Sequence, residues 1–208
     1  MRWRPLADLR GAAAPKLARL RDAERAGLRV PATVWAPAHE LLEAESVPRP
    51  RPGDAREGAL VVRSASVEED GEATTAAAGF LSLHLASGAD DGEVARASRE
   101  VARALIDREA AASGSGGLVF VQERVDALEA GVAFFDGFWL ERTSAAGGNV
   151  ELTSGSARGD VRRGGFVRGD ALFEWLARLH ARFAPRGEGT IDVEWAPDEG
   201  GLVLPQVP

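Results

Sequence analysis

The chain has 208 residues, of which 45% are hydrophobic and 27% charged, and its formal net charge is −7. This length allows one large domain or two small lobes around a buried core, and the acidic balance argues against binding to nucleic acid or to an anionic membrane surface. No apolar run approaches the roughly 18 residues that span a membrane, and the absence of cysteine excludes disulfides and predicts a cytoplasmic protein.

Hydrophobic periodicity predicts the elements of the first half of the chain. We expect helices over residues 6–26, 39–45 and 90–112, and strands over residues 29–35, 59–62 and 76–85. In the last of these strands, leucines at positions 81, 83 and 85 alternate with polar residues, which predicts one buried face. The Ser-Gly-rich run at 113–117 is the expected boundary between an N-terminal α+β lobe (1–112) and a C-terminal lobe (117–208).

The second half has a β character. We expect strands over residues 118–125 and 131–135, paired with each other, and two further strands near 138–141 and 149–153. Residues 170–183 are expected to form an amphipathic helix that buries Leu172, Trp175, Leu176 and Leu179. Two strands, 190–196 and 202–207, are expected to close the chain as a hairpin around residues 197–201.

The stretch 59–71 is the first candidate site. A short apolar strand is followed at once by Arg63, two serines and the acidic cluster of Glu68, Glu69 and Asp70. Such a cluster either holds a ligand, with the cation on an anion and the acids on a metal, or simply faces water. The stretch alone does not distinguish a ligand site from a solvated charge cluster, and motifs elsewhere in the chain are needed.

Several separated motifs resemble one family, the ATP-binding domain of phosphoenolpyruvate synthase, pyruvate phosphate dikinase and rifampin phosphotransferase. In chain order they are Gly11-Ala-Ala-Ala-Pro-Lys-Leu17, Gly27-Leu-Arg-Val-Pro31, Val62-Arg63-Ser64, Glu69-Asp70, Ala78-Gly79, Val121-Gln-Glu-Arg-Val125, Gly131-Val-Ala-Phe134, Asp192-Val-Glu-Trp-Ala196 and Leu204-Pro-Gln-Val-Pro208. Each fragment is weak alone, but their common order across the whole chain is hard to obtain by chance. The resemblance implies an α+β fold of ATP-grasp type, in which two lobes clasp a nucleotide.

The resemblance also implies roles for individual residues, with ATP and Mg²⁺ as cofactors. Arg63 would contact phosphate oxygens, and the strand carrying Gln122, Glu123 and Val125 would face adenine. Glu194 would bind magnesium, and Gln206 would lie near the terminal phosphates. Alternation along a strand puts Asp192 on the same face as Glu194, so both carboxylates are candidate metal ligands.

The chain departs from the family at positions that bear on activity. Alanine stands at position 13, where the family has lysine, and Val207 stands where it has arginine. Each lost charge-assisted hydrogen bond costs about 1.5–3 kcal/mol. Lys16, the only lysine, either replaces the missing cation one helical turn later or is a solvated surface residue.

No phosphohistidine domain fits in this chain, and we interpret His39, His84 and His180 as structural or surface residues. The function implied by the resemblance is therefore that of an ATP-binding subunit of a phosphotransferase, whose partner would be a separate phosphohistidine protein. A catalytically inactive pseudoenzyme that serves as a scaffold or regulatory partner is the alternative, favoured by Ala13 and Val207. A binder of a non-nucleotide small molecule is a third hypothesis, which no motif supports.

Overall fold

The chain was analysed as a computed structural model, which describes residues 1–10, 14–52, 58–66, 81–112, 116–125, 129–138, 140–146, 160–165, 170–184, 189–198 and 201–206. Its contacts divide it into two compact units. Unit 1 comprises residues 1–22 and 31–124, and unit 2 comprises residues 23–30 and 125–208. The division differs from the expected boundary at 113–117, because strand β5 (Leu118–Glu123) belongs to unit 1.

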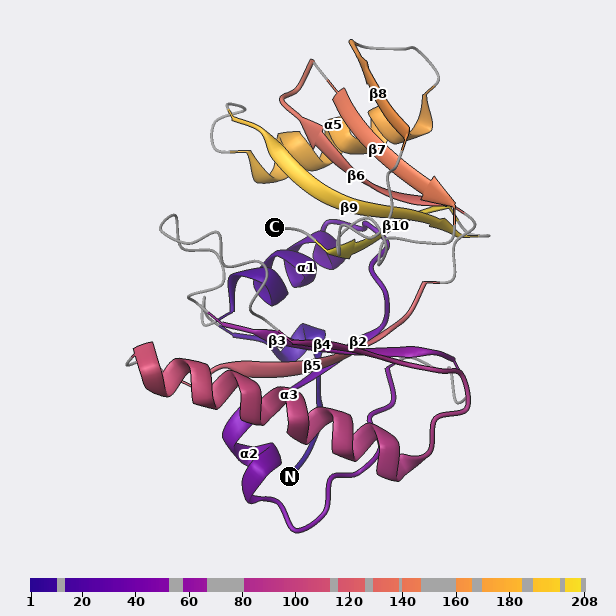
Figure 1. Cartoon of the computed structure of the whole chain (residues 1–208). Helices are drawn as coiled ribbons and strands as arrows, with labels where there is room; N and C mark the ends of the chain where they lie inside the picture. Colours follow the sequence, from indigo (N-terminus) through magenta and orange to yellow (C-terminus); the bar gives the residue numbers. More distant parts are fainter. Residues whose placement is uncertain are drawn as a thin grey trace. The chain divides into compact units, whose positions relative to one another are not determined.

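Unit 1 is built on a five-stranded antiparallel sheet in the order β1-β2-β5-β3-β4. Its other strands are β1 (Arg4–Pro5), β2 (Thr33–Pro37), β3 (Leu60–Ala65) and β4 (Ser82–Leu85). Its helices are the short 3₁₀ helix η1 (Leu6–Asp8), α1 (Pro15–Arg25, whose last residues belong to unit 2), α2 (Ala38–Glu43) and α3 (Asp91–Ala112). Figure 1 shows α2 and α3 on one side of this sheet and α1 on the other.

Alternation along the central strands separates the two faces of this sheet. Val62 of β3 and Val119 and Val121 of β5 are fully buried in a core cluster with α3. Arg63, Phe120 and Gln122 occupy the intervening positions, so they lie on the face opposite α3. The sequence of two adjacent strands thus assigns one face to the core and the other to polar and aromatic groups.

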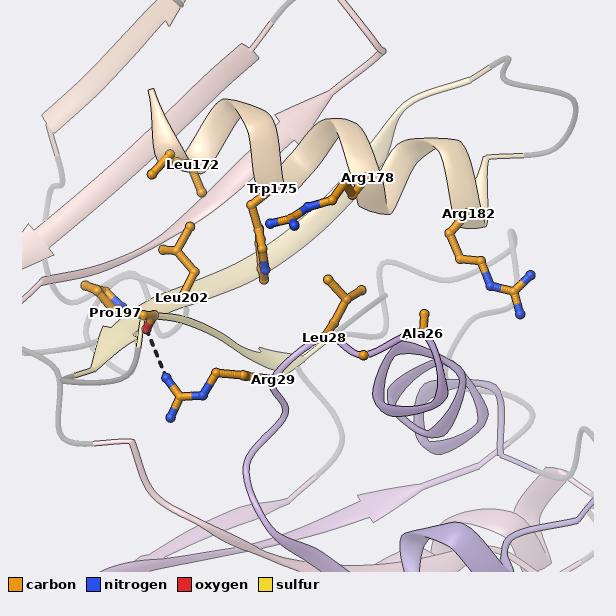
Figure 2. A pocket seen from close by; sticks show the side chains of 12 residues that line it. Ala26, Leu28, Arg29, Leu172, Trp175, Arg178, Arg182, Pro197 and Leu202 are labelled. Carbon is orange, nitrogen blue, oxygen red and sulfur yellow. Dashed lines mark hydrogen bonds between the residues drawn. The ribbon is translucent and has the colours of Figure 1, made fainter. Parts of the chain in front are cut away.

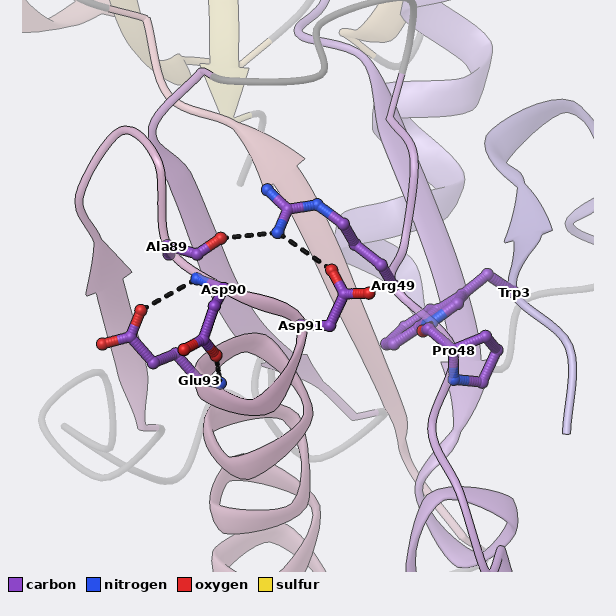
Figure 3. Close-up of polar contacts among 7 residues, drawn as sticks. All are labelled: Trp3, Pro48, Arg49, Ala89, Asp90, Asp91 and Glu93. Carbon is purple, nitrogen blue, oxygen red and sulfur yellow. Dashed lines mark hydrogen bonds and ion pairs between the residues drawn. The ribbon is translucent and has the colours of Figure 1, made fainter.

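The N-terminal end of α3 is fixed by side chains (Figure 3). Asp90 Oδ1 accepts a hydrogen bond from the backbone N–H of Glu93 at 2.7 Å, and Glu93 Oε2 accepts one from the N–H of Asp90 at 2.9 Å. This reciprocal capping box satisfies donors that the first turn of a helix leaves unpaired. Arg49 also donates to the carbonyl oxygen of Ala89 and forms an ion pair with Asp91. These contacts tie the proline-rich connection to the start of the helix.

The helices and strands expected in the first half are present with different bounds, whereas β1 was not predicted and residues 76–80 of the strand expected over 76–85 lie outside the described residues. The single helix expected over 6–26 is the 3₁₀ turn η1 followed by α1, which begins at Pro15, and proline is favoured in the first turn because its missing N–H has no partner there. In β4, Ser82 and His84 are exposed, whereas Leu81, Leu83 and Leu85 pack against the core, which confirms the predicted alternation.

Unit 2 contains a second antiparallel sheet, in the order β10-β9-β6-β7-β8, and one long helix. The strands are β6 (Glu129–Phe135), β7 (Leu140–Ala146), β8 (Asp160–Gly164), β9 (Ile191–Asp198) and β10 (Gly201–Gln206), and the helix is α5 (Ala171–Phe183). The ring of Phe135 on β6 meets that of Phe173 on α5 edge-on, with centroids 4.9 Å apart. α5 therefore packs on the sheet face that carries Phe135, and the four side chains expected to be buried are buried.

The pairing expected between residues 118–125 and 131–135 is wrong. Both edges of β5 are occupied by β2 and β3, and both edges of β6 by β7 and β9, so the two strands belong to different sheets. The C-terminal hairpin of β9 and β10 is confirmed, and β8 was not predicted. The strand expected at 149–153 lies outside the described residues. Within the described part of the chain, no helix combines the length and apolarity that crossing a bilayer requires.

Candidate functional site

The residues predicted to bind nucleotide and metal divide between the two units. Unit 1 holds Lys16, Arg63, Gln122 and Glu123, and unit 2 holds Val125, Asp192, Glu194 and Gln206. The departures Ala13 and Val207, the acidic cluster at 68–70 and the Ala78-Gly79 motif lie outside the described residues. Each unit therefore carries candidate residues of its own, and the two sets are described separately.

The two candidate metal ligands lie on one face of β9. Their neighbours Val193 and Trp195 are buried, and register with β6 puts Val193 opposite Ala133, next to Phe135 on the face that α5 covers. Asp192 and Glu194 alternate with these residues, so they lie on the other face of the sheet. Both are half-buried. The backbone of Gln206 stands opposite Glu194 in the β9–β10 register, after an irregularity that follows Val203.

The electrostatics of this pair suit a cation. Burial raises the pKa of Asp192 to about 6, and the neighbouring carboxylate of Glu194 adds to the increase. A hard divalent cation would relieve this repulsion, and Mg²⁺ is typically held by one or two carboxylates together with phosphate oxygens and water. Across the described ranges, no cluster of three or more histidine, cysteine, aspartate or glutamate residues exists that would form a complete metal cage. Two carboxylates fit a magnesium ion whose remaining ligands are phosphate oxygens and water.

In unit 1, Gln122 is held on the face of the sheet opposite α3. Its side chain is buried, and Nε2 donates to Thr33 Oγ1 at 3.2 Å, which in turn donates to the carbonyl oxygen of Pro31 at 2.8 Å. Glu123, the last residue of β5, is half-buried, and its backbone N–H donates to Ala32. A buried amide with a fixed orientation is a suitable partner for the polar edge of a ligand.

Arg63 belongs to a cluster of basic groups on the same face. It is half-buried, and its guanidinium carbon lies 5.9 Å from the ring centroid of Phe120. His84 on the adjacent strand β4 remains accessible to solvent, but partial burial of the side chain lowers its pKa, and the charges of Arg63 and Arg124 lower it further. The two arginines make this face electropositive and favour the neutral form of His84, and sequence reasoning recognised only Arg63. The alternation in β4 was the available signal, since it put His84 on the polar face.

Lys16 is not a solvated surface residue. Its relative exposure is 8%, so the alternative that placed it in solvent is contradicted. A buried ammonium group needs compensating partners, which is consistent with a structural or a ligand-binding role. Its contact with a phosphate stays a prediction.

The comparisons with known proteins concern the fold. No family model and no curated protein matches the chain. The crystal structure of L-amino acid ligase from Bacillus licheniformis matches with a TM-score of 0.55 at 15% identity, over 94% of this chain and 42% of that protein. The RimK domain protein ATP-grasp from Sphaerobacter thermophilus DSM 20745 matches with a TM-score of 0.45 at 17% identity, over 94% of this chain and 58% of that protein. The chain has an ATP-grasp fold.

This fold confirms the α+β, ATP-grasp-like architecture expected from the sequence motifs. The chain spans about half the length of the solved structures that it matches. Identities this low concern the fold and not the activity. Membership of the narrower phosphoenolpyruvate synthase family remains a prediction.

Proposed function

We propose that the chain binds ATP together with Mg²⁺ and serves as the ATP-binding component of an enzyme. The observation that carries the proposal is the pair of half-buried carboxylates, Asp192 and Glu194, on the face of the β9 strand that α5 does not cover. Burial, and second to it the carboxylate of Glu194, raise the pKa of Asp192, so the folded protein holds this acid where its charge is poorly solvated and close to another negative charge. The ATP-grasp fold supports the magnesium ion of a bound nucleotide as the ligand of these two carboxylates.

In this proposal the residues of each unit have separate tasks. Asp192 and Glu194 hold the magnesium ion, which when bound neutralises charge on the phosphate oxygens. Arg63 supplies a planar fork that binds phosphate oxygens in a bidentate way. Gln122, Glu123 and Val125 contact the adenine, and Gln206 lies near the terminal phosphates.

The finer proposal is a phosphotransferase component that resembles phosphoenolpyruvate synthase and passes phosphate to a separate phosphohistidine protein. Among the chain's own histidines, His180 is buried, its Nε2 lies 2.8 Å from the carbonyl oxygen of Gly189, and its ring packs edge-on against Phe135. His180 is therefore a poor phosphate acceptor, and the proposal of an acceptor on another molecule otherwise rests on the family resemblance.

Two other functions rest on specific observations. The fold similarity to an L-amino acid ligase supports an ATP-dependent ligase, which would join a substrate carboxylate to an amine. The sequence departures at Ala13 and Val207 support an inactive pseudoenzyme that keeps the fold as a scaffold. ATP consumption that requires L-amino acids would favour the ligase, and ATP consumption that requires a phosphohistidine protein would favour the phosphotransferase. Saturable ATP binding without ATP consumption in either assay would favour the pseudoenzyme.

Magnesium-dependent ATP binding is the test of the shared proposal. We expect ATP with Mg²⁺ to raise the melting temperature by on the order of 5 °C at a ligand concentration about 100-fold above Kd. Asp192→Asn and Glu194→Gln should lose the magnesium-dependent part of this increase in melting temperature. Asp107→Asn, on the exposed side of α3, should keep it. The absence of saturable stabilisation by ATP and by a non-hydrolysable analogue would overturn the proposal.

A further inference from the structure

Unit 2 contains a pocket that none of the predicted nucleotide residues lines (Figure 2). Its volume is about 610 Å³, and its walls come from α5, from the β9–β10 hairpin and from the segment after α1. The apolar and basic side chains that line it include Leu28, Arg29, Trp175, Arg178, Arg182 and Leu202. A volume of this size matches the range of small-molecule sites, roughly 300–1,000 Å³.

The pocket is distinct from the carboxylate pair. Pro197, which also lines it, continues the β9 series of Val193 and Trp195 on the face that α5 covers, and Leu202 stands opposite Pro197 in the β9–β10 register. Asp192 and Glu194 lie on the other face of the same sheet. A ligand in this pocket is therefore separated from the proposed magnesium site by the thickness of the sheet.

Three guanidinium groups give the pocket its charge. Arg178 and Arg182 follow Trp175 on one stripe of α5, near its C-terminal end, and both are exposed. In the part of the chain that the structure describes, neither of them forms an ion pair or a side-chain hydrogen bond. Arg29 reaches the pocket from the segment after α1, where Nη1 lies 3.5 Å from the carbonyl oxygen of Gly201. The guanidinium groups of Arg178 and Arg182, which face the cavity without a carboxylate partner among the described residues, favour an anionic ligand.

The remaining wall is apolar. Figure 2 shows the indole of Trp175 extending from α5 toward Leu28 and Leu202, and Leu172 lines the same wall. Trp175 is buried and Leu28 and Leu202 are half-buried, so this wall offers a fixed surface for an apolar ring or chain. The positive φ angles of Gly27 (77°) and Gly201 (117°) shape the two backbone segments that border the cavity.

We propose that this pocket binds a small organic anion, with its apolar body against Trp175, Leu28 and Leu202 and its carboxylate or phosphate on Arg178 and Arg182. The combination of an apolar wall with several convergent cationic groups is the usual chemistry of a site for such a ligand. The pocket shares no residue with the proposed nucleotide site, so the proposal does not rest on ATP binding.

The test uses phenyl phosphate and phenylacetate as anionic probes, with benzyl alcohol and benzylamine as their neutral and cationic counterparts. Each is titrated into the ¹⁵N-labelled full chain and followed by amide chemical shifts. We expect saturable shifts at α5 and at residues 201–202 with an anionic probe, and binding at least tenfold weaker with the neutral and cationic compounds. The anion with the lower Kd identifies the preferred acidic group.

Paired variants locate the charge that carries binding. Arg178→Gln combined with Arg182→Gln should raise the Kd of the anionic probe about tenfold or more, since charge-assisted hydrogen bonds are lost. Arg96→Gln combined with Arg103→Gln is the matched control, because it removes the same two charges from exposed positions on one face of α3. The proposal is overturned if neither anion binds saturably, if the shifts centre on Arg63 and Gln122 instead, or if both double variants bind the probe as the wild type does.

Discussion

Asp192 lies two residues before Glu194 on the same face of β9, where burial and the Glu194 carboxylate raise its pKa from 3.8 to about 6. The folded chain therefore binds a proton at Asp192 more tightly than the unfolded chain does. The stabilisation from this proton is fully present below about pH 4 and is lost as the pH rises through about 6. Two consequences can be measured.

The first consequence concerns stability. Asp192→Asn should raise the free energy of unfolding by about 1 kcal/mol at pH 8 and leave it nearly unchanged at pH 4, a magnitude reduced because solvent screens a half-buried carboxylate. Urea denaturation at both pH values, followed by tryptophan fluorescence, measures this difference. Asp107→Asn should show no comparable pH dependence, and an equal gain for Asp192→Asn at pH 4 and pH 8 would contradict the assignment.

The second consequence concerns metal affinity. Because Mg²⁺ competes with the proton at Asp192, its affinity in the presence of ATP should increase as the pH rises from about 5 to about 7. Isothermal titration at several pH values measures this increase. In Asp192→Asn the residual affinity should vary much less over this interval. A flat pH profile in the wild type would show that the ion, if it binds, does not use this carboxylate.

The N-cap of α5 supports both the sheet and the proposed anion pocket. Asp170 Oδ1 accepts hydrogen bonds from the N–H groups of Leu172 at 3.0 Å and Phe173 at 3.2 Å. Asp170→Ala should lower the free energy of unfolding by about 1 kcal/mol. Asp170→Ser should retain most of the stabilisation from the cap, since serine is also a good N-cap residue. Urea denaturation measures the free energy of unfolding of the wild type and of both variants, and we expect it to decrease from the wild type to Asp170→Ser to Asp170→Ala. An equal loss in both variants would mean that the cap is not what stabilises this end.

Glu109 connects two segments next to α3. Its buried carboxylate accepts from Ser66 Oγ at 2.8 Å and from the N–H of Gly117 at 2.7 Å, so Glu109→Ala leaves two buried donors without their acceptor. We expect a loss of about 2–3 kcal/mol in the free energy of unfolding. Glu100→Ala, at an exposed position of the same helix, is the control and should be close to neutral. A loss in Glu109→Ala no larger than that of the control would show that these hydrogen bonds contribute little.

Arg63 can be tested without any ligand through its effect on His84. Because the charge of Arg63 lowers the pKa of this imidazole, Arg63→Met should raise that pKa, while the larger contribution from burial remains. Histidine NMR titration resolves the change, since the chain has three histidines. Arg103→Gln should leave the pKa of His84 unchanged. A pKa of His84 that does not move in Arg63→Met would show that the two side chains do not interact in solution.

The sequence by itself determined the local elements and the class of the fold. Period-two alternation in β4 and the apolar stripe of α5 depend on neighbours along the chain, so they can be recognised from residue order alone. The scattered motifs from Val62-Arg63-Ser64 to Asp192-Val-Glu-Trp-Ala196 resemble those of the phosphoenolpyruvate synthase family in their order, and this resemblance implied an ATP-grasp architecture. They also predicted that Asp192 and Glu194 share a face, since strand alternation requires it.

Only the tertiary structure decided which strands pair and which side chains meet. Pairing joins residues that are distant in sequence, so β5 and β6, which follow one another and look alike, are separated by competition from β2, β3, β7 and β9 for their edges. Arg178 and Arg182 look like ordinary solvated arginines of an amphipathic helix. They line a pocket only because a segment near residue 28 and a hairpin near residue 202 complete its walls, and contacts between segments so far apart leave no period in the sequence.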